Sequence, residues 1–200
     1  MYLILATVKI KGTRPLLFHC FTPDTISLQK KERTGVAGND PEEWKRTYTA
    51  TSGGQLYLSS TYIFGCLRDA ARYTKKGRGS IQSDLSATLQ VIDDKILLNR
   101  FINNQGDITT NSSQAVYVDV QSIRNPATKG RNVRYRLGLS PGWETSFTLL
   151  WDVTLVNRTQ MEAVCIDAGK LVGLADGRSI GMGRFEVVSF EANNAQKATS

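Results

Sequence analysis

Alternation of hydrophobic and polar residues marks several strands along this chain. In residues 2–11, Val8 and Ile10 lie between threonine and lysine residues. Residues 115–123 alternate in the same way around three valines. A period of two is typical of a half-buried strand. Further strands are expected at 133–139, 143–156 and 186–190, and the first two are separated by the turn sequence Ser140-Pro141-Gly142.

Two longer segments have helical periodicity. One begins at Ser59 or Ser60 and places its apolar residues between 63 and 71 on one face. The other covers 159–172. Shorter helices are expected at 41–46 and around 83–91. The main elements therefore run strand, helix, strand, strand, helix, strand, which predicts an α+β fold of ferredoxin-like or RRM-like type, an antiparallel sheet with two helices on one face.

Length and composition suit one domain, which we place at residues 1–191. Two hundred residues with 40% hydrophobic content can bury a sizeable core. Long insertions are expected at about 22–55 and 75–115, and the small polar residues 192–200 predict a flexible tail. We expect Trp44, in the first insertion, to be exposed on its short helix, where it could dock a neighbouring subunit.

The charge balance favours an anionic partner. The formal net charge is +7 and the isoelectric point is near 9.4, values that are common in nucleic-acid-binding domains. The three cysteines lie in apolar contexts and predict reduced, buried thiols, with no metal or cofactor. The apolar N-terminal run lacks the features of a signal peptide, and no segment is long enough to span a membrane, so we expect a soluble, cytoplasmic protein.

The densest basic segment lies between 115–123 and 133–139, which are the two middle strands of the expected fold. It covers residues 124–136 and contains no acidic residue. Arg134 and Arg136 share one face of the expected strand because side chains alternate with a period of two. A basic hairpin of this kind can straddle a sugar-phosphate backbone, although a merely solvated hairpin remains an alternative. The candidate phosphate contacts in this segment are Arg124, Lys129, Arg131, Arg134 and Arg136.

A second basic cluster follows the first long helix and consists of Lys75, Lys76 and Arg78, interspersed with two glycines. Cations at the C-terminal end of a helix oppose its macrodipole, which explains part of this cluster. Three cations within four residues exceed that requirement. The cluster is therefore a candidate ligand-facing loop, with simple capping as the alternative.

A glycine-rich segment joins the last helix to the last strand. Glycines permit sharp turns in which backbone N–H groups can face an anion, although a glycine-rich connection is also a common structural device. Two arginines lie among these glycines. The candidate residues here are Gly177, Arg178, Gly181, Gly183 and Arg184.

Three segments resemble those of RAMP-superfamily proteins, above all small phage and prophage relatives of the backbone subunits of CRISPR effector complexes. They are residues 12–19 (GTRPLLFH), 67–72 (LRDAAR) and 183–187 (GRFEV). The resemblance implies an RRM-like core whose glycine-rich loop and basic hairpin cradle single-stranded nucleic acid, with subunits associating along the strand. It implies binding roles for the five loop residues and the 124–136 hairpin, and residence in the host cytoplasm if the chain is phage-encoded. This chain is shorter than typical CRISPR backbone subunits.

Some RAMP relatives cut RNA with a histidine, so His19, the only histidine in the chain, must be considered. A nuclease would need a second proton-transfer group beside it, and the sequence fixes none. We therefore expect a non-enzymatic protein that binds single-stranded RNA or DNA largely independently of sequence. The alternative from another class is a structural or assembly protein that binds an acidic protein partner.

Overall fold

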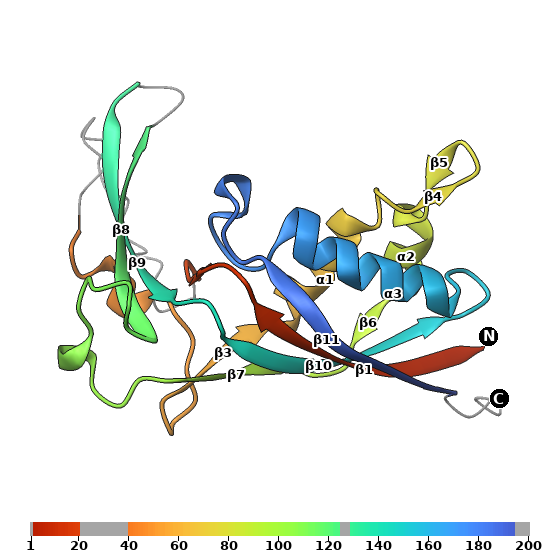
Figure 1. Cartoon of the computed structure of the whole chain (residues 1–200), viewed down its shortest axis with the longest axis horizontal. Helices are drawn as coiled ribbons and strands as arrows, with labels where there is room; N and C mark the ends of the chain where they lie inside the picture. The colour runs from red at the N-terminus through yellow and green to blue at the C-terminus, as the bar shows by residue number, and fades with distance from the viewer. Residues whose placement is uncertain (1, 21–39, 125–128, 195–200) are drawn as a thin grey trace, which may run out of the picture.

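The structure is a computed structural model that describes residues 2–20, 40–124 and 129–194 (Figure 1). Strands and short helical segments alternate along the chain. In order, the elements are β1 (Leu3–Gly12), β2 (Leu16–Leu17), η2 (Glu43–Arg46), β3 (Gln55–Ser59), α1 (Ser60–Ala70), β4 (Lys75–Lys76), β5 (Gly79–Ser80), α2 (Gln82–Thr88), β6 (Gln90–Val91), β7 (Lys95–Phe101), η3 (Gln105–Asp107), β8 (Val116–Arg124), β9 (Arg131–Leu139), β10 (Glu144–Asp152), α3 (Arg158–Asp167), η4 (Ala168–Val172), η5 (Arg178–Ile180) and β11 (Phe185–Asn194).

The central sheet is antiparallel and has the strand order β11-β1-β10-β7-β3, with β6 paired to β10. Within it, β11-β1-β10-β7 is the strand order of a ferredoxin-like fold, with α1 before β7 and α3 before β11. The predicted α+β, ferredoxin-like class is therefore confirmed.

The helices α1 and α3 lie on one face of this sheet (Figure 1). The helix α1 begins where predicted, because the Ser59 hydroxyl accepts a hydrogen bond from the Thr61 N–H. On β1, Val8 and Ile10 are fully buried and belong to the same core as Ile63 and Leu67 of α1. Alternation on β1 thus directs its apolar side chains toward the helices, and burial of that apolar area stabilises the layered arrangement.

A separate three-stranded sheet, β2-β9-β8, carries the basic hairpin. The sequence placed residues 115–123 and 133–139 in the middle of the central sheet, and this was wrong. The position next to β10 is taken by β7, which lies within the predicted insertion at 75–115. In β7, the buried residues Ile96 and Leu98 flank Leu97, which is exposed. Because all three are apolar, the sequence shows a continuous apolar run and not the alternation of a half-buried strand. The hairpin β8–β9 instead projects from one end of the central sheet (Figure 1).

Three further segments differ from expectation. Trp44 is buried in the core at 5% exposure, so it is not the exposed docking residue that we expected. The predicted helix at 159–172 consists of α3 followed by the π-helical segment η4. The last strand extends to Asn194, since Ala192 pairs with Ala6, and the rest of the predicted tail, 195–200, lies outside the described residues.

Candidate functional site

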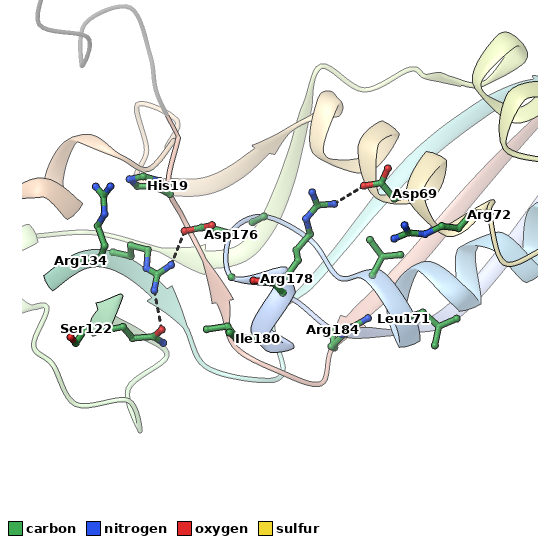
Figure 2. Close-up of a pocket in the computed structure, with 16 residues that line it drawn as sticks. His19, Asp69, Arg72, Ser122, Arg134, Leu171, Asp176, Arg178, Ile180 and Arg184 are labelled. Atoms are coloured by element: carbon green, nitrogen blue, oxygen red, sulfur yellow. Dashed lines mark hydrogen bonds and ion pairs between the residues drawn. The ribbon is translucent and has the colours of Figure 1, made fainter. Parts of the chain in front are cut away.

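A cavity of about 950 Å³ lies between the second sheet, the end of α1 and the segment from η4 to β11 (Figure 2). The part of the chain that the structure describes contributes five arginines and two aspartates to its lining, which give a formal charge of +3 with His19 neutral. The charged and titratable lining residues are Arg72, Arg134, Arg136, Arg178, Arg184, Asp69, Asp176 and His19.

One wall of this cavity is built on β9. Arg134 and Arg136 both line it, so the shared strand face predicted from their spacing is confirmed. Arg136 is only 3% exposed, and its guanidinium donates to Asp176 at 2.7 Å, Asp119 at 3.3 Å and Gln121 at 3.1 Å. Arg136 therefore ties the glycine-rich segment to the β8–β9 hairpin.

The two carboxylates around Arg136 respond to it differently. Burial tends to raise the pKa of Asp176, but hydrogen bonds from Arg136 and the Gly177 N–H outweigh burial and lower that pKa. At Asp119, burial dominates and raises the pKa in spite of Arg136. Asp176 is therefore the better-stabilised anion of the pair.

Arg134 contacts a second acidic group at the same wall. Its Nη1 donates to Glu43 Oε1 at 2.7 Å, and His19 Nε2 lies 3.4 Å from the same oxygen. Glu43 comes from η2, in the first predicted insertion, and its side chain is 14% exposed. The site thus holds a histidine, a carboxylate and an arginine in one group, a combination that the sequence alone did not predict.

The opposite wall contains η5 and the end of α1. Gly177 and Gly181 flank η5, and both adopt the left-handed conformation that glycine favours. Between them, Arg178 Nη1 donates to Asp69 Oδ2 of α1 at 3.2 Å, and the Arg178 side chain is 42% exposed. Burial tends to raise the pKa of Asp69, but Arg68 and Arg178 outweigh burial and lower it. The charge pair on this wall is therefore more accessible to solvent than the network around Arg136.

The glycines shape this segment without offering all of their amides to a ligand. Gly183 donates its N–H to the Pro15 carbonyl at 2.7 Å and accepts from the Leu174 N–H at 2.9 Å. Its φ is +69°, and an added Cβ would lie 1.9 Å from the Leu174 carbonyl oxygen. The Gly181 N–H donates to the Arg178 carbonyl at 3.1 Å. These two N–H groups are therefore bonded within the fold, and the positive charge of the cavity comes from arginine side chains.

Arg184 has unused hydrogen-bonding capacity. Its Nη1 is buried and has no hydrogen-bond partner among the residues that the structure describes. A buried guanidinium donor without a partner is costly, because the desolvated group recovers no hydrogen bond. Arg184 also lines a second cavity, of about 610 Å³, together with Arg14 and Lys170. An anion that reaches Arg184 would supply the missing acceptor.

The remaining predicted basic residues lie outside the cavity lining. Arg124, Lys129 and Arg131 are exposed near the tip of the β8–β9 hairpin. A different hairpin, β4–β5, carries the second cluster and projects on the other side of the molecule (Figure 1). That cluster comprises Lys75, Lys76 and Arg78, of which Lys76 donates to Asp84 at 2.6 Å. Binding roles for these two groups stay predictions.

Sequence reasoning missed several residues of the site. Arg72, which follows the end of α1, was not among the candidate residues, yet it lines the cavity. The acidic partners Glu43, Asp69, Asp119 and Asp176 were not predicted either. Glu43, Asp176 and Asp69 leave little signal in sequence because they pair with arginines 91, 40 and 109 positions away.

Three other properties concern the described part of the chain. Its three cysteines, Cys20, Cys66 and Cys165, are buried and form no disulfide, as the sequence predicted. Within the described ranges, no cluster of three or more histidine, cysteine or acidic side chains is suited to hold a metal ion. No helix in those ranges has the length and apolar character needed to cross a membrane.

Comparison with known proteins gives distant likenesses in structure and none in sequence. No family model matches the chain, and no curated protein matches it in sequence. A solved structure described as the cryo-EM structure of the Type III-B Cmr-beta bound to cognate target RNA contains a chain that aligns with a TM-score of 0.48 and 14% identity. The alignment covers 96% of the present chain and 61% of that chain, so the present chain spans about three-fifths of its length. At this TM-score the likeness carries no functional inference.

Proposed function

We propose that this chain binds single-stranded nucleic acid, RNA or DNA, by contacting phosphates in the arginine-lined cavity. The observation that carries the proposal is the convergence of five arginines from three parts of the chain on one cavity. Guanidinium groups suit phosphate because their planar N–H donors match its oxygens and stay charged at all relevant pH values. Contacts to phosphates do not depend on base identity, so binding is largely independent of sequence.

The arginines differ in the roles that we assign to them. Arg72 and Arg178 are exposed, and Arg134 is 39% exposed, so these three can reach a phosphate at little structural cost. Arg184 has a buried donor that lacks an acceptor. Arg136 is buried between its two carboxylate partners, and it holds the glycine-rich segment against the β8–β9 hairpin. We assign phosphate contact to the first four and a positioning role to Arg136.

The proposal retains the behaviour that the resemblance to RAMP-superfamily proteins implies, including self-association along a strand. It assigns no catalysis to the site, so strands incubated with the protein should stay intact on a denaturing gel. Cleavage that is lost in His19→Ala would overturn the non-enzymatic assignment.

The test is fluorescence anisotropy with labelled single-stranded DNA, single-stranded RNA and duplex of one sequence, measured across a salt series. Tight single-strand binding that weakens with salt is expected. The double variant Arg72→Gln, Arg178→Gln should bind about tenfold or more weakly and reduce the salt slope by about 1.4, since each lost phosphate contact on a single strand accounts for about 0.7.

The matched control is Lys9→Gln, Lys11→Gln, which removes two exposed charges from β1 on the sheet face opposite the buried side chains. It should leave binding nearly unchanged. Equal losses in both double variants would show that net charge, and not the cavity, determines binding. Absence of binding at low salt would favour an acidic protein partner instead.

A further inference from the structure

The arginine-lined cavity also contains apolar side chains that the protein does not bury. Leu171 of η4 and Ile180 of η5 line the cavity and are 45% and 57% exposed. Neither belongs to the core, nor to the partly buried residues that pack against it. Single exposed aliphatic residues are common on protein surfaces, but two inside a charged cavity are not explained by packing.

These two side chains alternate with arginines along one edge of the cavity. In Figure 2, Ile180, Arg184 and Leu171 lie in a row, and Arg178 and Arg72 lie in a second row beside it. Phosphate gains nothing from aliphatic carbon, so this edge fits a ligand that combines anionic groups with apolar surface. A nucleotide has both, because its base presents an apolar face next to the charged sugar-phosphate backbone.

Base recognition that does not depend on tryptophan, tyrosine or phenylalanine fits the lining. Among the residues that the structure describes, none of these three types lines the cavity, and the aromatic ring that does is the imidazole of His19. Aliphatic side chains and the flat faces of guanidinium groups can both cover a base. In a duplex, neighbouring base pairs already cover those faces, so the apolar edge is useful only to an unpaired strand.

We infer that Leu171 and Ile180 contact the faces of unpaired nucleobases while the neighbouring arginines hold the phosphates. This inference rests on the proposed function and deepens it, because it explains a preference for single strands. Contact with base faces, unlike contact with base edges, does not distinguish one base from another.

The test compares oligonucleotides that have the same phosphates with and without bases. Labelled twelve-residue thymidylate and uridylate strands are measured by anisotropy beside abasic strands of equal length and sugar type. The wild type should bind base-containing strands about tenfold or more tightly than abasic ones. Ile180→Ser and Leu171→Ser, made separately, should each weaken binding to base-containing strands about fivefold and leave abasic binding and the salt slope unchanged.

Leu155→Ser is the control, because Leu155 is 41% exposed and lies outside the cavity lining. It should leave binding to both kinds of strand unchanged. Equal wild-type affinity for strands with and without bases would overturn the inference on the unmodified protein, whatever the variants do. Equal weakening of both strands by either serine variant would also overturn it. If the wild type binds none of the strands at low salt, the proposed function itself fails.

Discussion

The two arginine walls of the cavity show how one residue type serves two purposes. On the β9 wall, Arg136 is 3% exposed and donates to three side chains. On the η5 wall, Arg178 is 42% exposed and pairs with Asp69. A buried cation must keep its partners, because an unpaired buried charge is very costly. An exposed cation can exchange a carboxylate for a phosphate at little cost, because a surface ion pair contributes little.

Under the proposed function, the β9 wall supports the site and the η5 wall contacts the phosphates. Arg136 holds Asp176, and therefore the start of the glycine-rich segment, against the β8–β9 hairpin. Arg178 lies further along the same segment, between two glycines in left-handed conformation. Rigid support on one side and an exchangeable charge pair on the other are what a preorganised anion site requires.

Arg136→Met should have the largest effect on stability. It leaves Asp119 and Asp176 without their shared cation, so we expect a loss of about 3 kcal/mol in the free energy of unfolding. Arg178→Met, which breaks a partly exposed pair, should cost less than about 1 kcal/mol. Urea denaturation of both variants measures the difference. Equal losses would contradict the distinction between the two walls.

A pair of glycine variants should separate packing from backbone conformation on the η5 wall. Gly183→Ala places a Cβ 1.9 Å from the Leu174 carbonyl oxygen, so we expect a loss of about 2–3 kcal/mol. Gly181→Ala has open space but a φ of +82°, so the left-handed conformation alone should cost about 1 kcal/mol. Thermal unfolding followed by circular dichroism compares them. A larger loss for Gly181→Ala would contradict the tight packing of Gly183.

Local patterns predicted the parts of the site that depend on neighbours in sequence. The period of two placed Arg134 and Arg136 on one face, and Ser59 marked the start of α1. The glycine spacing predicted sharp turns, which the left-handed Gly177 and Gly181 confirm. These features follow from backbone geometry over a few residues, which sequence records directly.

Long-range pairing could not be predicted in the same way. The segment 124–136 contains no acid, yet Arg136 is neutralised by Asp119 of the paired strand and by Asp176, 40 residues away. The sequence also predicted β8, and not β7, as a strand of the central sheet. The alternation of β7 is difficult to recognise because Leu97 is apolar although it is exposed. Which strand joins a sheet depends on packing across the fold, and local periodicity does not specify it.

Acid should weaken the β9 wall through Asp176. Its pKa is lowered in the folded protein, so its carboxylate stabilises the fold above the ordinary aspartate pKa of about 4. That stabilisation is lost as the pH falls through the lowered pKa. Because the Asp176 side chain is 39% exposed, screening limits the effect, and the wild type should lose about 0.5–1 kcal/mol more than Asp176→Asn between about pH 5 and pH 2. Urea denaturation at several pH values measures this, and parallel pH profiles would show that Asp176 does not stabilise the wall.

The smallest expected effect concerns ligand binding at the η5 wall. Asp69→Asn removes the charge partner of Arg178 and one negative charge from the cavity. Single-strand affinity should therefore rise about two- to threefold at low salt, because a partly exposed pair contributes well below 1 kcal/mol. Glu144→Gln, which removes a carboxylate that pairs with Lys9 and Lys11 outside the cavity lining, is the matched control and should leave affinity unchanged. Weaker binding by Asp69→Asn would mean that Asp69 orients Arg178 toward the strand, so that the η5 wall, like the β9 wall, is a fixed support.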